Sequence, residues 1–570
     1  MRGMATLGDH ARNAAPGLVL GVGLLVRVVF LAGADEPALV RVVPDDAYYY
    51  FKVARNVVAG QGATFDGIHP TNGYHPLWMG ALIPVAGVVR DPLLFVRVAL
   101  GLGVALSFLT AILLHRLVRR LTDSWWIPLL ALILYWLNPR AVVSSLNGLE
   151  TSLSTFLFTL LLWLTLGEGG VRCSVFGVGG SEGGNRHAAR GTRQATLHSL
   201  VLGGLMGLLF LARTDNVFFV AVFWLATVAM TERAERLRRA VVMAAAAAAL
   251  AVPWVAYNWL VFGSPIQVSG LSIPYVHHEL YRLQGHSSGE AVAHGLKQFA
   301  VMLYEGLRGE IGYSRLVSFP AIALSLLVFA MRWRKEPATR RAVLVLLGLG
   351  LASLAHLFVH AAIRWYPRPW YFDQLLVLLP AVFALALGVL ARGAGIPDSR
   401  TPSSLSANPQ SLGGLMLAAL VALASVQTTL GVRALARGEW PWAGEMLDAA
   451  RWLRDNTKKD DVAAAFNAGI IGYYSERRVV NLDGAVNNAA HEALRRKDLI
   501  GFMRQAKVTH YLDFEPMMRR QFGGFFDPGY SLMRCSMVAV PGFEASGPGW
   551  SDSHIKVFSL EWQQEGTKEE

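Results

Sequence analysis

Two adjacent carboxylates and three consecutive tyrosines follow the first apolar segment, in the stretch PDDAYYYFKVARN (44–56). A proline followed by acidic residues is typical of a helix start, because carboxylates there complement the helix dipole. We predict a short amphipathic helix in which Asp45 shares one face with Tyr49, and Asp46 shares the neighbouring face with Tyr50. Adjacent carboxylates repel, so one gains a raised pKa that suits a general base, or the two share a metal. The alternative is that Asp45 only caps the helix and Asp46 is solvated.

The loop after this helix, GQGATFDGIHPTNGYHPLWM (60–79), is dense in glycine, polar groups and aromatic rings. Its donors, acceptors and flat rings are of the kinds that hold polyols and sugars. The candidate binding residues of this loop are His69, Asn72, Tyr74 and His75. The alternative is an ordered interfacial loop whose rings belong to the aromatic belt of a membrane protein.

The elements that must position these residues are membrane helices. Of 570 residues, 53% are hydrophobic and only 16% are charged, against about 25% charged in soluble proteins. Apolar runs of spanning length cover 16–33, 93–114, 197–212, 215–230, 240–262, 317–331, 342–362, 373–391 and 412–432. Shorter runs at 126–138 and 151–166 bring the prediction to about eleven transmembrane helices. The first helix has no small-residue cleavage site after it, so we expect it to be retained.

The distribution of basic residues predicts the orientation. The loops 115–120, 231–239 and 332–341 carry three, four and five Lys or Arg, whereas 139–150 and 363–372 carry one and two. The positive-inside rule then places the N-terminus in the cytoplasm.

Three segments are therefore expected on the outer face, namely 34–92, 263–316 and the chain after about 433. The net charge of +12 is spread over loop ends that face lipid headgroups, so no nucleic-acid partner is expected. The richness in Gly, Ala and Arg favours a GC-rich bacterial genome, and hence a multi-pass protein of the bacterial cytoplasmic membrane.

The chain after the last apolar run has a different pattern. AGEMLDAARWLRDNT (443–457) has helical spacing, and DVAAAFNAGIIGYYSERRVVNLDGAVNN (461–488) has short apolar runs broken by Gly and Asn. A segment of about 130 residues is large enough to bury its own core. We predict a transmembrane domain over 1–432 and an extracytoplasmic α/β domain over 433–570.

In their order along the chain, these motifs resemble the GT-C superfamily of membrane glycosyltransferases. The acidic pair, AYYYFKVARN, a G-x-G-x-x-F turn and TNGYHPLW are similar to bacterial arabinofuranosyltransferase-like and protein-mannosyltransferase-like members. Three later segments agree with the resemblance, namely NGLETSL (147–153), LARTDN (211–216) and GIIGYYSERRVVNLDGAVNN (469–488).

The resemblance implies an enzyme that takes a sugar from a polyprenyl-phosphate carrier and transfers it, usually with inversion, to a glycan, lipid or protein acceptor. By residue-by-residue comparison, Asp45 would be the catalytic base and Asp46 its helper. The chemistry agrees, because an acceptor hydroxyl must lose its proton as it attacks the anomeric carbon. A donor that already lies in the membrane requires no nucleotide-sugar fold.

The departing lipid phosphate is an anion, so cations must meet the developing charge. Candidates are Lys52, Arg55, Arg213, Arg364 and Arg368. An Arg at the membrane boundary is also a common snorkelling anchor. Arg213 beside Asp215 is the strongest of them, because a charged pair between two tightly spaced apolar segments is costly unless it is used or neutralised.

A metal ion is the next question for this site. Asp45, Asp46, Glu150 and His75 could converge on one divalent ion such as Mg²⁺ or Mn²⁺, since hard oxygen ligands suit these ions. No ligand motif of fixed spacing is present, so we expect no obligatory metal and no other cofactor. Glu150 is otherwise a candidate substrate ligand.

In the tail, Asp483 in NLDGAVNN (481–488) either contacts the acceptor or donor sugar, or belongs to an Asx-turn after a strand. Two other classes of protein compete with the enzyme. A transporter or flippase of lipid-linked sugars would show intramembrane charge and repeated halves, and a scaffold of cell-envelope assembly would not need the acidic pair. The charged residues cluster at outer helix ends and no clear repeat is present, which favours the enzyme.

Overall fold

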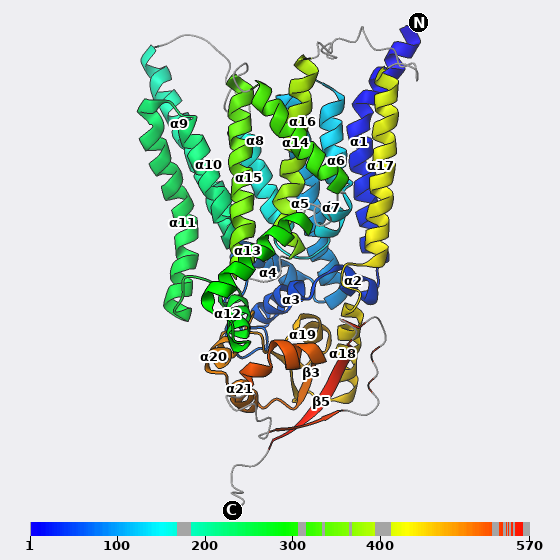
Figure 1. The fold of residues 1–570 in the computed structure, drawn as a ribbon, viewed down its shortest axis with the longest axis vertical. Helices are drawn as coiled ribbons and strands as arrows, with labels where there is room; N and C mark the ends of the chain where they lie inside the picture. Colours follow the sequence, from blue (N-terminus) through cyan, green and yellow to red (C-terminus); the bar gives the residue numbers. More distant parts are fainter. Residues whose placement is uncertain are drawn as a thin grey trace, which may run out of the picture.

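The computed structural model describes residues 2–122, 124–167, 184–305, 315–332, 337–363, 368–393, 412–526, 535–539, 543, 545, 549–550 and 553–562. A bundle of long helices occupies one end of the molecule together with the N-terminus, and a domain containing a β-sheet occupies the other end (Figure 1). The short helices α2 (Glu36–Val42), α3 (Asp45–Val58) and α12 (Val268–Leu283) lie between the two. The sequence-predicted α/β tail is therefore present.

The bundle is formed by apolar helices. Their bounds are α1 (Arg2–Gly33), α4 (Pro76–Val88), α5 (Pro92–Leu121), α6 (Trp126–Trp136), α7 (Pro139–Ser144), α8 (Thr151–Gly167), α9 (Gly184–Ala212), η2 (Thr214–Asn216), α10 (Val217–Ala229), η3 (Arg233–Glu235), α11 (Arg236–Phe262), α13 (Ser288–Glu305), α14 (Arg315–Arg332), α15 (Pro337–Ile363), η5 (Pro369–Phe372), α16 (Asp373–Gly393) and α17 (Leu412–Arg437). Within the described ranges, seven helical stretches are long and apolar enough to cross a membrane, and five apolar helices are shorter.

The multi-pass membrane architecture is thus confirmed, while the total of eleven spans stays a prediction. The seven long stretches coincide with predicted spans, and four of the five shorter helices coincide with the remaining ones. The fifth, α4, lies in the segment that we predicted to be an outer loop.

The helix α3 begins at Asp45, where the sequence predicts a helix start. Pro44 is its N-cap with an extended backbone, and Asp45 and Asp46 form its acidic first turn. Ala47, Tyr48 and Phe51 are buried on this short helix. The burial of both apolar and tyrosine positions means that α3 is covered on more than one side, by the bundle and by the tail.

The tail contains α18 (Ala443–Asn456), α19 (Gly469–Tyr474), α20 (Asn488–Arg496), α21 (Leu499–Gln505), η6 (Met517–Gln521) and η7 (Gly523–Phe525) around a five-stranded sheet. The strands are β1 (Val462–Ala465), β2 (Arg478–Asn481), β3 (His510–Phe514), β4 (Cys535–Ala539) and β5 (Ile555–Trp562). The strand order is β2-β1-β3-β5-β4. β1 is parallel to both β2 and β3, with Val462 opposite Arg478, whereas β5 is antiparallel to β3 and β4.

The loop after α3 joins the tail to the bundle. The Asn72 side chain accepts from the Val268 backbone N–H (3.0 Å) and the Asn488 amide (3.1 Å), and its own amide donates to Asn258 (3.1 Å). At Gly73 a β-carbon would lie 2.0 Å from the carbonyl oxygen of Ala485, so this close approach requires glycine. One short loop therefore bridges α11, α12 and the tail.

Candidate active site

The predicted base, Asp45, is held by the tail. Its carboxylate accepts the backbone N–H groups of Gly469 (3.0 Å) and Ile470 (2.6 Å), which form the first turn of α19. A helix start offers unpaired N–H groups, so a carboxylate is a favourable partner there. Each carboxylate oxygen keeps further lone pairs, so Asp45 can still accept a proton.

Tyr49 extends this contact one helical turn further along α3. Its hydroxyl donates to the Phe466 carbonyl (3.2 Å) and accepts from the Ala468 N–H (3.2 Å). The Asn481 amide also donates to it (3.3 Å). The face of α3 that carries Asp45 and Tyr49 is therefore hydrogen-bonded to the tail.

Asp46 and Asp483 add negative charge to this region. Burial raises the pKa of Asp45 to about 7, and the charge of Asp46 contributes to this increase. The two backbone hydrogen bonds from α19 act in the opposite direction and lower the pKa. Burial likewise raises the pKa of Asp483 to about 7, with additional contributions from Asp46 and Asp45. The acidic pair and Asp483 thus lie within electrostatic reach of one another, with two carboxyl groups that titrate near neutral pH.

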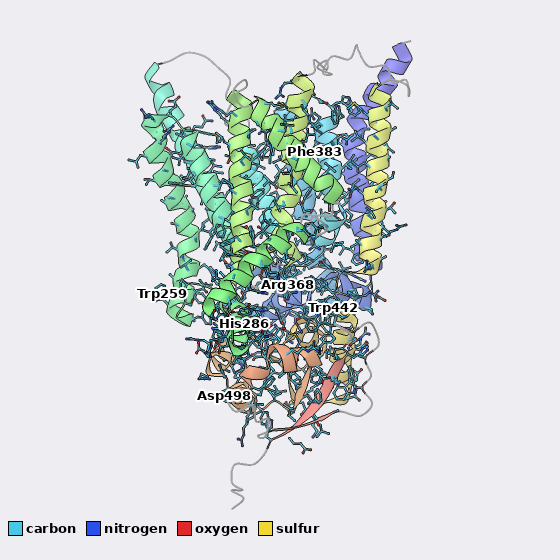
Figure 2. All side chains as sticks on the ribbon, in the orientation of Figure 1. Trp259, His286, Arg368, Phe383, Trp442 and Asp498 are labelled. Carbon is cyan, nitrogen blue, oxygen red and sulfur yellow. The ribbon has the colours of Figure 1, made fainter. Side chains whose placement is uncertain are left out.

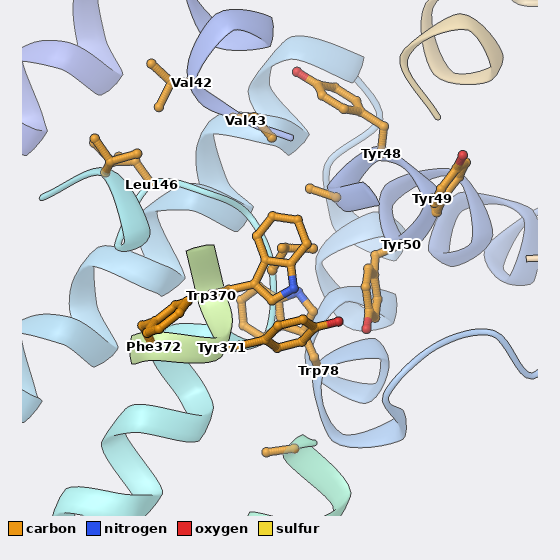
Figure 3. Packing of buried hydrophobic residues seen from close by; sticks show 14 of the residues in the cluster. Val42, Val43, Tyr48, Tyr49, Tyr50, Trp78, Leu146, Trp370, Tyr371 and Phe372 are labelled. Carbon is orange, nitrogen blue, oxygen red and sulfur yellow. The ribbon is translucent and has the colours of Figure 1, made fainter. Parts of the chain in front are cut away.

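The neighbouring face of α3 meets a different set of residues. The Tyr50 hydroxyl accepts from the His75 backbone N–H (3.2 Å). Burial and the nearby Glu150 carboxylate raise the pKa of Tyr50 well above its usual range. Figure 3 shows the three tyrosines diverging from α3, with Tyr50 on the side of Trp78 and Tyr371.

Glu150 and Arg213 lie beside His75 at the ends of bundle helices. Glu150 Oε1 is 3.7 Å from His75 Nε2 and 3.5 Å from Arg213 Nη1. Both charged residues are buried, yet neither Glu150 Oε2 nor Arg213 Nη1 makes a hydrogen bond to any part of the chain that the structure describes. Buried polar atoms without partners are rare, and each one calls for an explanation such as a ligand.

Arg213 also forms a bidentate ion pair with Asp215, the charged pair that the sequence predicts. Its Nε is 3.1 Å from Asp215 Oδ1 and its Nη2 is 2.7 Å from Oδ2. The guanidinium carbon lies 5.2 Å from the centre of the Tyr371 ring. Three of the predicted residues, Glu150, Arg213 and Asp215, are therefore brought together with His75.

The other predicted cations lie elsewhere. Lys52 is flanked by Arg55 and Glu476, and burial together with Arg55 lowers its pKa to about 8. Arg55 donates to the Arg90 carbonyl (2.9 Å). Arg368 is exposed at the level where the bundle meets the tail (Figure 2), and Arg364 lies outside the described residues.

The remaining loop residues have structural contacts. His69 Nδ1 is 2.6 Å from Asp66 Oδ2, its ring packs on Phe502, and Asn72 makes the bridge described above. The Tyr74 ring packs against Trp254. None of these three contacts involves the Glu150 and Arg213 side chains, so the loop contributes His75 to that cluster.

The predicted metal ligands are divided between the two faces of α3. Asp45 contacts the tail, whereas Glu150 and His75 lie beside Arg213. Among the described residues, one group of three brings metal-ligating atoms within 4.8 Å of one another, and it consists of Asp215, His356 and His360. The two histidines were missed in the sequence, although their spacing of four residues in an apolar helix was a usable signal.

Comparisons with known proteins bear on the fold. A domain of unknown function (DUF8728) matches residues 435–551, and no curated protein matches the chain. The oligosaccharyltransferase of Archaeoglobus fulgidus tethered with an acceptor peptide is similar in structure, with a TM-score of 0.57 and 13% identity over 98% of this chain and 75% of that one.

Two further solved structures are similar. The same archaeal oligosaccharyltransferase, AglB, in complex with an inhibitory peptide and a dolichol-phosphate gives a TM-score of 0.52 at 14% identity, covering 96% of this chain and 76% of that one. ArnT from Cupriavidus metallidurans bound to undecaprenyl phosphate gives 0.47 at 14% identity, covering 95% and 97%. The likeness to the two oligosaccharyltransferase structures, over 98% and 96% of this chain, extends over the bundle and the tail together.

Proposed function

From the GT-C fold of this chain, we propose that it is a glycosyltransferase that moves a sugar from a polyprenyl-phosphate carrier to a glycan, lipid or protein acceptor. The related fold of AglB has been solved with a dolichol-phosphate and with an acceptor peptide, which supports a lipid-linked donor and a separate acceptor. The acceptor belongs to the cell envelope in this proposal, and the sugar is a hexose or a pentose.

The observation that carries the proposal is a pair of buried atoms at the bundle end, Arg213 Nη1 and Glu150 Oε2, that make no hydrogen bond to the described residues. Arg213 Nη1 is a charged donor that suits a phosphate oxygen, and Glu150 Oε2 is a charged acceptor that suits a sugar hydroxyl. Both side chains are already held in place by Asp215 and His75 on their other sides. A sugar phosphate would satisfy both orphan groups at once.

Asp45 is the base in this proposal. The acceptor hydroxyl attacks the anomeric carbon, its proton passes to the Asp45 carboxylate, and the sugar–phosphate bond breaks with the electron pair leaving on the lipid phosphate. Attack opposite the leaving group inverts the anomeric centre. A carboxyl pKa of about 7 suits a base at neutral pH, and the two N–H donors of α19 fix its orientation.

The site lies on the outer side of the membrane in this proposal. The end of α1 and the start of α5 are joined by a hydrogen bond from Arg97 to the Ala34 carbonyl (2.9 Å), so the basic end of α5 is at the opposite end of the bundle. The positive-inside rule puts that basic end in the cytoplasm. The tail and the acidic pair then face outward from a bacterial cytoplasmic membrane.

The test is sugar transfer in proteoliposomes with a panel of radiolabelled polyprenyl-phosphate sugars and envelope extract as acceptor. We expect wild type to transfer at least one sugar, and Asp45→Asn to lose about 100-fold or more, as removal of a general base does. The matched control is Glu492→Gln, which removes an exposed carboxylate of the tail that forms an ion pair with nearby Arg495.

Equal transfer by wild type and Asp45→Asn would exclude Asp45 as the base. If wild type transfers no sugar in the panel but moves fluorescent polyprenyl phosphate between leaflets, the flippase is the correct function. Gel filtration of each variant shows whether it has folded.

A further inference from the structure

Two histidines of α15 and one carboxylate form a cluster beside the proposed donor site. His356 and His360 are one helical turn apart, which places both rings on the same face of α15. Their Nε2 atoms lie 3.2 and 2.9 Å from the same oxygen, Asp215 Oδ2. Asp215 comes from η2, the short turn between α9 and α10.

Hydrogen bonding accounts for the position of His360, whose Nε2 pairs with Asp215 Oδ2 at 2.9 Å, but not for that of His356. Its side chain is 1% exposed, and within the described part of the chain neither ring nitrogen makes a hydrogen bond. Nε2 is near enough to Asp215 Oδ2 for a hydrogen bond but is not aligned for one. A buried imidazole normally places at least one nitrogen in a hydrogen bond, and a metal ion bound at Nε2 would explain this arrangement.

We propose that Asp215 Oδ2, His356 Nε2 and His360 Nε2 bind a divalent transition-metal ion of the zinc class. Two imidazole nitrogens and one carboxylate oxygen are a common protein ligand set for zinc. In a tetrahedral site with metal–ligand bonds of about 2.0–2.1 Å, neighbouring ligand atoms are about 3.3 Å apart. The observed separations of 3.2 and 2.9 Å need only a slight opening of the cluster.

The surroundings orient the three ligands. The His360 ring stacks on Tyr371 at 3.9 Å, and the His356 ring packs against Phe218 and Phe219. Arg213 holds the Asp215 carboxylate at both oxygens, as outer hydrogen-bond partners of metal-bound carboxylates do. Three protein ligands leave a fourth position open.

This site revises the expectation from the sequence in two respects. The residues that we considered for a metal were Asp45, Asp46, Glu150 and His75, and none of them belongs to the cluster. The hard oxygen ligands considered there favour Mg²⁺ or Mn²⁺, whereas two imidazoles favour a softer ion. The proposal is independent of the proposed function, because binding is measured without any substrate.

The experiment uses the full chain in detergent, stripped with a chelator, dialysed against Zn²⁺ and analysed for metal by mass spectrometry. We expect about one zinc ion per chain in wild type. His360→Gln and the double variant His356→Gln/His360→Gln should bind at least about tenfold more weakly. The matched control is His294→Gln in α13, which removes a histidine that contacts Gln298 and should retain the metal.

A second readout is the visible spectrum of the Co²⁺-loaded protein, which reports nitrogen ligands directly. We expect a ligand-field band in wild type and in the control, and its loss in His360→Gln. Absence of stoichiometric metal in loaded wild type would overturn the proposal, and so would equal binding by all variants. Because the His360 ring is partly exposed, the single variant serves if the double variant does not fold.

Discussion

The two faces of α3 differ in the groups that surround their charged side chains, although the residues that define the faces are adjacent in the sequence. On the face of Asp45 and Tyr49, neutral backbone groups of the tail surround carboxylates, and burial raises the carboxyl pKa to about 7. On the face of Tyr50, buried Glu150 and Arg213 lie 3.5 Å apart as opposite charges.

The difference separates two chemical tasks. A carboxylate whose pKa lies near neutral pH can take a proton from an acceptor hydroxyl when it is ionised, whereas a buried guanidinium with an unused donor can bind an anion without changing its protonation. The proposed proton acceptor and the proposed phosphate ligand therefore lie at neighbouring faces of the same helix, α3. Substitutions on one face should affect a different step from those on the other.

After the loss expected for Asp45→Asn, the largest effect is expected at Arg213. Arg213→Gln leaves Asp215 and Glu150 without their buried cation, which typically costs about 2 kcal/mol or more, or about 30-fold. Transfer measured against donor concentration should show a raised KM for the lipid-linked donor. Arg213→Lys, which keeps the charge but loses the two-pronged geometry, should be intermediate. If the KM for the donor is the same in wild type, Arg213→Gln and Arg213→Lys, Arg213 does not bind the donor phosphate.

Gly469 tests the face of α3 that carries Asp45. In Gly469→Ala the new β-carbon would lie 2.2 Å from the Asp45 carbonyl oxygen and 2.9 Å from its Oδ1. We expect about 1–3 kcal/mol of destabilisation of the contact between tail and loop, with faster hydrogen exchange in α19 and transfer reduced about tenfold. Gly444→Ala is the matched control, because its β-carbon meets nothing within 4 Å. Equal exchange in both variants would contradict a tight contact.

The pH dependence of sugar transfer should arise from the face that carries Asp45 and not from the face of Tyr50. Asp45 accepts a proton only when ionised, so with a raised pKa the rate should increase as pH rises through about 7 and then level off. Asp46→Asn removes a charge that raises the Asp45 pKa, so the midpoint of the residual kcat/KM should move to lower pH, by less than about one unit. Glu492→Gln should leave the midpoint in place. A profile that is flat between about pH 5.5 and 8.5 would exclude this base.

The smallest effect is expected at Lys52. Its neighbours are Arg55 and Glu476 rather than the Glu150 cluster, so Lys52→Gln should change transfer less than about threefold, because sites that share no partners act independently. Initial rates at saturating and limiting donor would measure this. A loss as large as that of Arg213→Gln would mean that both faces bind the donor phosphate.

Local features of the site were predictable from the sequence. The start of α3 at Asp45 and the pairing of Arg213 with Asp215 follow from short-range helix geometry and charge. The seven long apolar helices follow from hydropathy. Each of these depends on residues that are close along the chain.

Long-range contacts were not predictable in the same way. The N–H groups that hold Asp45 belong to backbone, so no side-chain type identifies them. The approach of α15 to η2 brings His360 to Asp215, 145 residues away, and hydropathy does not report which helices are neighbours. Lys52 and Arg55 have the right charge for a phosphate but point toward the tail, a direction decided by packing.

The contact between Asp45 and α19 has a consequence for biosynthesis. Its partners are separated by 424 and 425 residues, and ribosomes add about 5–20 residues per second, so about 20–85 s pass between their synthesis. During that interval the segment after the first helix has been synthesised, but the N–H groups of Gly469 and Ile470 that bind Asp45 have not. A chain that stalls or is truncated between Arg437 and Gly469 would carry both aspartates and all the bundle helices, yet the Asp45 carboxylate would lack the two backbone N–H groups that orient it.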